Sequence, residues 1–270
     1  MRRSIIAVLL LASLATGPSP ARAEGVLHLY AAGSLTGAMT ALLAAAGLPA
    51  DRVATPVFGP SGVLRERIER GAPADILASA DMQQPRRLAR DRGNRPVVLF
   101  TRNRMCALAR QDLGLTPANL LDRMLDPKVR LATSTPRADP AGDYAWAVFA
   151  RAEALRPGAQ AALQAKALKL VGGPDTQPLV PGKGQVQGVF LADKADIMLG
   201  YCSGAAEVMR DVPALASVPL PNELTLAPAY GMVVLTDNAL ADRFAIFVMS
   251  ERGQAILAQY GFKPVALPTD

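Results

Sequence analysis

The sequence has 270 residues, half of them hydrophobic, and a formal net charge of +6. This length and hydrophobic content allow one large domain or two ordinary domains, each with a substantial core. The basic excess is mild and no basic stripe is interleaved with aromatic residues, so nothing points to nucleic-acid binding.

The first residues have the pattern of a secretory signal peptide. Arg2 and Arg3 precede an apolar run at 5–14, and the Ala-Arg-Ala motif at 21–23 fits a cleavage site. We predict that residues 1–23 are removed on export to the periplasm; a buried N-terminal helix is the alternative. Charged residues interrupt every later apolar stretch, so we predict no membrane insertion.

The chain that follows alternates strands and helices. Residues 26–31 predict a strand, and the apolar residues after Ser34 recur at helical spacing. Residues 53–58 predict a second strand, which a Gly-Pro-Ser-Gly turn and a helical stripe up to Gly71 follow. A third strand is predicted at 76–78.

The same alternation continues to the C-terminus. Further strands are predicted at 105–109, 130–133, 197–201 and 230–235, and helices at 144–155, 186–191, 239–250 and 253–260. Such alternation is typical of an α/β fold with mostly parallel sheets and helices on both faces. The pattern alone does not divide the chain into two lobes.

Residues suited to catalysis are scarce. His28 is the single histidine and lies in a predicted strand, where a structural role is more common than a catalytic one. No nucleophile elbow, zinc cluster or Walker motif is complete. We therefore predict that the protein is not an enzyme and has no cofactor.

Two cysteines, Cys106 and Cys202, leave two possibilities open. An oxidising periplasm permits a disulfide between them, whereas buried free cysteines are also common.

Several residues, most of them small or hydroxyl-bearing, lie where helices are predicted to begin. They are Ser34, Ser61, Ala141 with Gly142 after Pro140, and Val186. A helix start offers unpaired N–H groups and a partial positive charge, so several starts brought together form a cradle for an anion. Simple helix capping is the alternative for each serine.

In this arrangement the chain resembles the periplasmic molybdate-binding proteins (the ModA family) over residues 26–262. The similar segments, in chain order, are LYAAGSLT at 29–36, GAPADI at 71–76, SAD at 79–81, PAG at 140–142, GY at 200–201 with SGA at 203–205, and YGF at 260–262.

The resemblance implies a type II periplasmic-binding-protein fold with the ligand in the cleft between two lobes. Lobe I would comprise 24–102 and 228–270, and lobe II 103–227, with crossings near Arg102 and Pro228. It also implies a monomer that delivers molybdate or tungstate to the permease and ATPase subunits of an ABC importer. Molybdenum would be held as its oxyanion, without direct metal ligands. The residues implied as donors are Ser34, Ser61, Ala141, Val186 and Tyr201.

Three positions depart from the family pattern. The second loop has a single serine, Ser61, where relatives have a run of serines, and Gln185 stands where an acidic residue is common. Asp139 precedes Pro140, and we expect it to cap the following helix. The alternatives are a binding protein for sulfate, phosphate or a small carboxylate, a sensor of ligand occupancy, or an exported enzyme.

Overall fold

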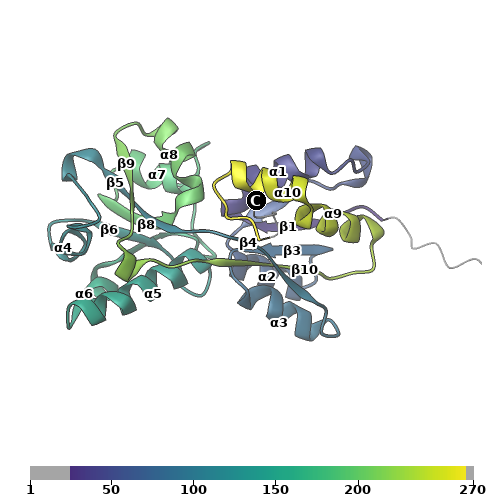
Figure 1. Ribbon diagram of the computed structural model, residues 1–270, viewed down its shortest axis with the longest axis horizontal. Coiled ribbons are helices and arrows are strands. Elements are labelled where there is room, and N and C mark those ends of the chain that lie inside the picture. The colour runs from purple at the N-terminus through teal and green to yellow at the C-terminus, as the bar shows by residue number, and fades with distance from the viewer. Residues whose placement is uncertain (1–24, 266–270) are drawn as a thin grey trace, which may run out of the picture.

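The computed structural model describes residues 25–265, so the predicted signal peptide at 1–23 lies outside the described residues. Two α/β lobes lie side by side, each built on a five-stranded sheet (Figure 1). In the part of the chain that is described, no helix is both long and apolar enough to cross a membrane. The two-lobe α/β class implied by the resemblance is confirmed.

Lobe I has the sheet order β2-β1-β3-β10-β4. Its strands are β1 (Leu29–Ala32), β2 (Val57–Gly59), β3 (Ile76–Ser79), β4 (Val97–Arg102) and β10 (Ala229–Val234). Its helices are α1 (Thr36–Ala45), α2 (Ser61–Glu69), α3 (Gln83–Asp91), α9 (Ala239–Met249) and α10 (Glu251–Gln259). One core packs α1, α9 and α10 on the sheet, and a second packs α2 and α3 on the opposite face (Figure 1).

Lobe II has the sheet order β7-β6-β8-β5-β9. Its strands are β5 (Met105–Arg110), β6 (Leu131–Ser134), β7 (Leu168–Val171), β8 (Ile197–Tyr201) and β9 (Leu215–Pro219). Its helices are α4 (Leu120–Leu125), α5 (Pro140–Leu155), α6 (Ala159–Lys166), α7 (Gln185–Leu191) and α8 (Ala205–Asp211). A core beneath α4, α5 and α6 and another beneath α7 and α8 cover the two faces.

The sheets are more mixed than the sequence pattern predicts. Strand β1 runs parallel to β2 and β3, and β6 runs parallel to β7 and β8. Strand β10 is antiparallel to β3 and β4, and β5 is antiparallel to β8 and β9. All of the antiparallel pairings involve β5 or β10. The chain enters lobe II from lobe I along β5, and it enters lobe I from lobe II along β10.

The second strand also differs from its prediction at 53–58. Within that range the ladder begins at Val57, and Val53 forms only an isolated bridge with Leu27. Pro56 has no N–H to donate to a ladder, which accounts for the late start.

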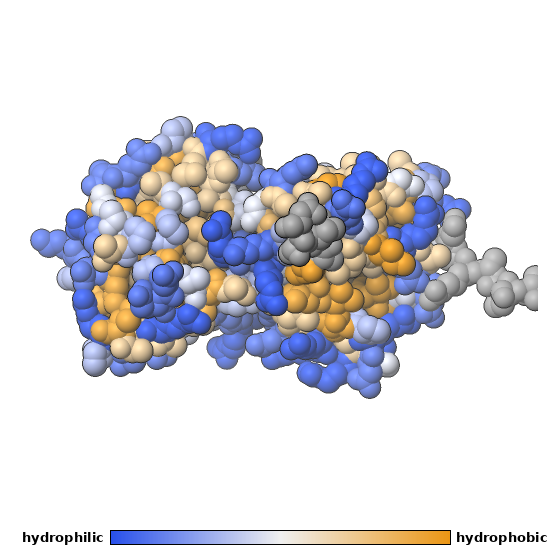
Figure 2. All heavy atoms as spheres, in the orientation of Figure 1, coloured by the Kyte–Doolittle hydropathy of each residue, from blue (hydrophilic) through white to orange (hydrophobic). Residues whose placement is uncertain are grey.

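Two chain crossings join the lobes. The chain passes from β4 to β5 through Asn103 and Arg104 and returns from β9 to β10 through residues 220–228. The crossings are hydrogen-bonded to each other, since Asn103 N–H donates to the carbonyl of Pro228 at 2.9 Å. In space filling the lobes appear as two rounded masses with a polar surface over the waist between them (Figure 2). The residue limits implied for the lobes remain a prediction.

Candidate functional site

A cavity of about 480 Å³ lies between the lobes, and residues of both line it. Lobe I contributes Ala32, Gly33, Ser34 and Thr36 at the end of β1, with Gly59 and Pro60 at the end of β2. Lobe II contributes Ser134, Asp139, Ala141, residues 184–187, Gly200, Tyr201 and Glu207. The ends of strands and the starts of helices therefore meet at this cleft.

The cavity brings together most of the residues that the resemblance implied as donors. Ser34, Ala141, Val186 and Tyr201 all line it. Ser61 does not: it is fully buried in the first turn of α2, and its Oγ accepts a hydrogen bond of 3.1 Å from Ala80 N–H. Its neighbours Gly59 and Pro60 reach the cavity instead.

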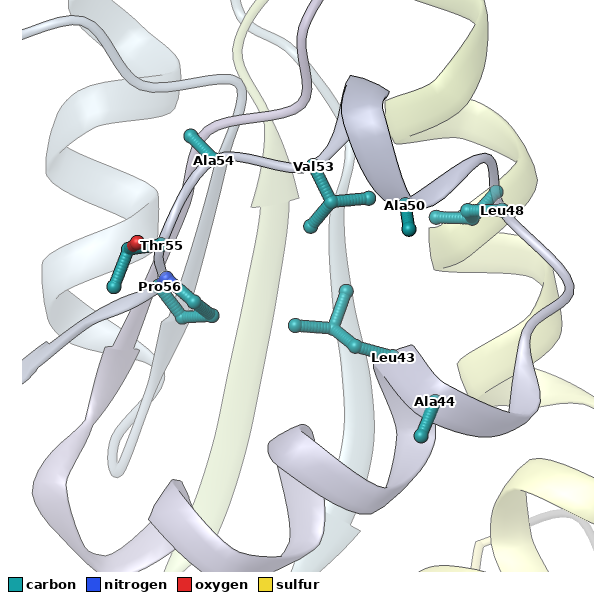
Figure 3. Close-up of a pocket in the computed structure, with 8 residues that line it drawn as sticks. All are labelled: Leu43, Ala44, Leu48, Ala50, Val53, Ala54, Thr55 and Pro56. Atoms are coloured by element: carbon teal, nitrogen blue, oxygen red, sulfur yellow. The ribbon is translucent and has the colours of Figure 1, made fainter.

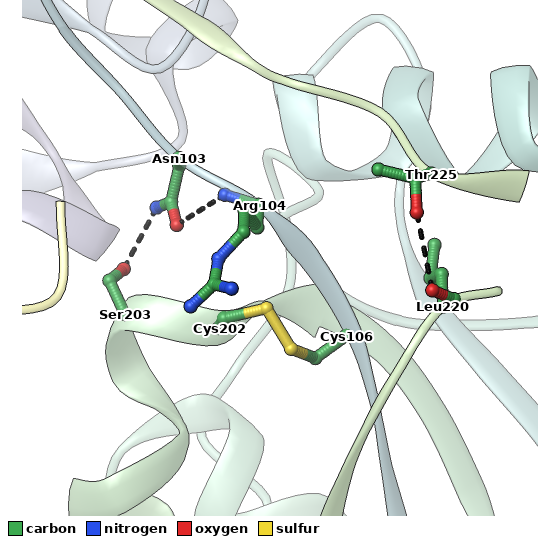
Figure 4. The surroundings of a disulfide bond; sticks show 7 residues. All are labelled: Asn103, Arg104, Cys106, Cys202, Ser203, Leu220 and Thr225. Atoms are coloured by element: carbon green, nitrogen blue, oxygen red, sulfur yellow. Dashed lines mark hydrogen bonds between the residues drawn. A yellow bond between two sulfur atoms is a disulfide. The ribbon is translucent and has the colours of Figure 1, made fainter. Parts of the chain in front are cut away.

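Ser34 belongs to a hydrogen-bonded chain that reaches the crossing between the lobes. Its Oγ lies 2.9 Å from the hydroxyl of Tyr230, and Asn103 Nδ2 donates to that hydroxyl at 3.1 Å. Asn103 Nδ2 also donates to Ser203 Oγ at 2.8 Å (Figure 4). Because Tyr230 accepts from Asn103, it is free to donate to Ser34, and the Ser34 hydrogen then remains for the cavity.

Tyr201 supplies a donor that has no partner yet. Its hydroxyl oxygen is buried and makes no hydrogen bond of normal geometry within the described residues, although it lies near enough to the Tyr230 hydroxyl to act against the rise in the pKa of that group. Burial raises the pKa of Tyr201 well above its ordinary value, so the hydroxyl keeps its proton and can donate it. The ring is held edge-on against Tyr230, with centroids 5.6 Å apart. A buried polar group of this kind calls for an explanation, and a ligand acceptor is the simplest.

The start of α5 is already occupied by a side chain of its own. Asp139 caps the helix as predicted: its Oδ1 accepts from Ala141 N–H at 3.3 Å, and its Oδ2 accepts from Ser134 Oγ at 2.5 Å. Burial raises the pKa of Asp139 to about 6. Helix α5 begins at Pro140, as the Asp139 cap and the proline predict, and thus four residues before the apolar stripe that begins at Tyr144.

The charges around the cavity are unusual for an anion site. Its lining includes the carboxylates of Asp139 and Glu207 and, among the described residues, no arginine, lysine or histidine. His28 lies elsewhere, paired through its backbone with Asp75. Nor do the described residues place three or more histidines, cysteines, aspartates or glutamates together where they could hold a metal ion. Attraction for an anion must come from N–H and hydroxyl dipoles.

Comparison with known proteins agrees with a ligand cleft between two lobes. Residues 27–263 match the family described as bacterial extracellular solute-binding protein. The chain belongs to this family. An uncharacterized protein of Pasteurella multocida (strain Pm70), PM1146, is 32% identical over 208 residues, which make up 77% of this chain and 86% of the relative.

Solved structures of solute-binding proteins share its fold. The periplasmic molybdate-binding protein of Azotobacter vinelandii is 18% identical with a TM-score of 0.66, covering 90% of this chain and 100% of that one. The sulfate-binding protein SubI of Mycobacterium tuberculosis H37Rv is 19% identical with a TM-score of 0.67, covering 89% and 87%. The resemblance noted in the sequence is thus confirmed for the fold and for membership of the solute-binding proteins.

A disulfide stiffens this solute-binding protein beside the cavity. Cys106 at the start of β5 and Cys202 just after β8 are bonded, with Cα atoms 5.1 Å apart (Figure 4). The two strands pair antiparallel, which brings the cysteines within bonding distance. Of the two possibilities that the sequence left open, the structure shows the bond.

A second cavity, of about 400 Å³, opens between the end of α1 and the segment before β2 (Figure 3). It is lined mainly by apolar side chains, among them Leu43, Leu48 and Val53, and it contains none of the predicted donors. We therefore place the solute site in the cleft between the lobes.

Sequence reasoning missed several residues of the cleft. Tyr230 lies behind the lining, hydrogen-bonded to Ser34, and nothing in a strand pattern distinguishes a tyrosine whose hydroxyl faces a binding residue. Gln187 and Glu207 line the cavity although no sequence pattern singles them out, and Gln185, which the sequence marks only as a departure from the family pattern, lines it too. Glu207 lies in α8, beyond the segments that resemble the family motifs, so only the folded chain brings it to the site.

Proposed function

We propose that the protein captures a small oxyanion in the cleft and delivers it to the permease and ATPase subunits of an ABC importer in the periplasm. Molybdate or tungstate is the proposed ligand. One observation carries the proposal: Ser34, Ala141, Val186 and Tyr201, which come from separate segments, line a single cavity. Those are positions at which the resemblance to molybdate-binding proteins implies donors.

The chemistry of the lining supports an oxyanion rather than a metal cation. Hydroxyl groups of Ser34 and Tyr201 are donors, and the starts of α5 and α7 bring backbone N–H groups to the same space. Such neutral donors hold a tetrahedral dianion when helix dipoles supply the positive potential. Molybdenum would then be held through its oxygens, without a direct bond to the protein.

A different small anion is the second candidate, and the Asp139 carboxylate favours it. An acceptor in the lining suits a ligand that brings its own hydrogen-bond donor, such as hydrogen phosphate. A solved neighbour described as sulfate-binding shows that the fold serves more than one oxyanion.

Thermal melting of the purified mature protein tests the proposal. Melting temperatures are compared in molybdate, tungstate, sulfate, phosphate and an anion-free buffer of the same ionic strength. A ligand at 100 times its Kd should add about 2.7 kcal/mol to the free energy of unfolding. Molybdate and tungstate should raise the melting temperature most. Equal melting temperatures in every buffer would refute oxyanion capture. A higher melting temperature in phosphate or sulfate alone would mean that this anion, and not molybdate or tungstate, is the ligand.

A further inference from the structure

The carboxylate of Asp139 occupies a donor that a bound anion would use. Its Oδ1 accepts the hydrogen of Ala141 N–H, one of the groups proposed to hold the ligand. Asp139 and Ala141 line the same cavity. An anion that reaches Ala141 N–H must therefore share this donor with a carboxylate or displace it.

The carboxylate has little room to move away. Ser134 Oγ donates to its Oδ2 at 2.5 Å, and the pair packs against the backbone of Gly172. A Cβ atom at Gly172 would lie 2.0 Å from Ser134 Oγ and 2.6 Å from Asp139 Oδ2. Gly172 also has φ of +75°, a conformation that glycine adopts without strain. The backbone thus holds the Ser134–Asp139 pair at the edge of the cavity.

Among the described residues no cation forms an ion pair with this carboxylate. The charged groups with the strongest action on Asp139 are Asp143 on α5 and Asp81 after β3, and both raise its pKa. Arg137 and Arg87 act on Asp143, whose pKa they tend to lower. Glu207 of α8 lines the same cavity. The phenols of Tyr201 and Tyr230 also interact with Asp139, and burial keeps both of them neutral. An anion added to this environment meets a like charge, which opposes its binding and favours protonation of the carboxylate.

The surroundings accept either protonation state of Asp139. Ser134 Oγ lies within hydrogen-bond distance of two acceptors, Asp139 Oδ2 and the carbonyl of Val171 at 3.2 Å. With Asp139 ionised, the Ser134 hydroxyl donates to it. With Asp139 protonated, the carboxyl donates to Ser134 Oγ, whose hydrogen turns to Val171. Protonation therefore leaves no buried group unpaired.

We propose that Asp139 is a specificity-determining residue that couples the capture of a fully ionised oxyanion to the uptake of one proton from solvent. The inference rests on the proposed function. The occupied site holds the dianion beside a neutral Asp139 carboxyl, and no covalent bond forms or breaks except the one that binds this proton. Since the free carboxyl has a pKa near 6, uptake is largest above that pH, where the empty site is ionised.

Calorimetric titration with molybdate, and in parallel with sulfate, tests this coupling. Wild type, Asp139→Asn and Asp143→Asn are titrated from pH 5.5 to 8.5, in pairs of buffers that differ in ionisation enthalpy and so report protons taken up per anion. Asparagine keeps an oxygen that can accept from Ala141 N–H, so the helix cap survives in Asp139→Asn. Asp143 lies on the same helix outside the cavity lining and is the matched control.

For wild type we expect an uptake that approaches one proton per anion near pH 7, and a Kd that rises about tenfold per pH unit above 6. Asp139→Asn should show no uptake and a Kd that is flat with pH and lower than that of wild type at pH 8. Asp143→Asn should keep the uptake. Wild-type binding without proton uptake, or uptake that persists in Asp139→Asn, would overturn the inference while leaving oxyanion capture intact. If neither anion binds wild type or Asp139→Asn at any pH, the proposed function fails and the coupling with it.

Discussion

The backbone N–H of Gly62 donates a hydrogen bond of 3.0 Å to the carbonyl of Ala138, and this bond spans the two lobes. Gly62 lies in the first turn of α2 in lobe I, and Ala138 lies just before α5 in lobe II. A Cβ atom at position 62 would lie 2.6 Å from the carbonyl oxygen of Arg137 and 2.7 Å from that of Ala138. Because both atoms belong to the backbone, only glycine allows the lobes to approach this closely.

Gly62→Ala should therefore hinder closure of the cleft. We expect the affinity for the bound oxyanion to fall by about tenfold or more, which corresponds to about 1.4 kcal/mol of binding free energy. The ligand-dependent decrease in radius of gyration, measured by small-angle X-ray scattering, should shrink as well. Gly188→Ala is the control, since a Cβ there meets no atom closer than 3.4 Å. Unchanged affinity in Gly62→Ala would mean that the contact with Ala138 is not needed in the bound state.

Tyr201, which lines the cavity, and Tyr230, which is buried beside it, should respond differently to loss of the hydroxyl. Tyr201→Phe removes a buried hydroxyl without a partner in the described chain, so stability should change little while oxyanion affinity falls. Tyr230→Phe removes the partner of Ser34 and Asn103 and should lower the free energy of unfolding by about 1–3 kcal/mol. Urea denaturation without ligand, with calorimetry for affinity, separates the two. A destabilised Tyr201→Phe would show that its hydroxyl serves the fold.

The two serines predicted as donors should also separate. Ser34→Ala should weaken oxyanion binding, because Ser34 lines the cavity. Ser61→Ala should chiefly destabilise the fold by about 1–3 kcal/mol, because it leaves the buried N–H of Ala80 without its acceptor. Melting without ligand and binding measured on the same preparations give both quantities. If Ser61→Ala lost affinity at unchanged stability, Ser61 would belong to the site after all.

The disulfide should contribute substantially to stability. Cys106 and Cys202 are 96 residues apart, and a closed loop of this length restricts the unfolded chain strongly. Replacing both by alanine should lower the free energy of unfolding by about 2–4 kcal/mol. Wild type reduced with dithiothreitol is the matched comparison. The double alanine variant and the reduced wild type should unfold at the same urea concentration. Equal midpoints for oxidised and reduced protein would contradict this expectation.

The sequence predicts the strands and helices of the two lobes well where local signals agree. Residues 197–201 form β8 as predicted, and α5 ends at Leu155 as predicted. The apolar spacing alone places the start of α5 at Tyr144, whereas the Asp139 cap and Pro140, which are also local signals, place it at Pro140, where the helix begins. Local patterns also cannot foresee that β5 and β10 cross between lobes, since that depends on pairing with strands distant in the chain.

The candidate site was predictable in part, and for a physical reason. A helix start, a proline and a small residue are local features, so Ser34, Ala141 and Val186 could be singled out from the sequence. Burial is not a local feature, and it removes Ser61 from the cavity lining while leaving the hydroxyl of Tyr201 without a partner among the described residues. The hydrogen bond between Ser34 and Tyr230 joins residues 196 positions apart, which no spacing rule reveals.

Asp139 should make the stability of the empty protein depend on pH in a specific direction. Burial raises its pKa from an ordinary value near 3.8 to about 6 in the folded chain. Between these values the folded state binds a proton that the unfolded state does not, so the stability contributed by Asp139 rises as pH falls from 6 to 4. Above pH 6 the carboxylate is ionised in both states, and its burial costs about 3 kcal/mol there.

Asp139→Asn should therefore be more stable than wild type at pH 7, by up to about 3 kcal/mol, and the advantage should vanish near pH 4. Arg130 lowers the pKa values of Asp193 and Asp196, so protonation of these carboxylates in acid destabilises both proteins. The two losses are equal and cancel in the difference between variant and wild type. Urea denaturation of both proteins at pH 4, 5, 6 and 7, without anions that could occupy the cleft, measures that difference directly. A variant less stable than wild type at pH 7 would show that the charged cap on Ala141 N–H stabilises α5 by more than burial of the carboxylate costs.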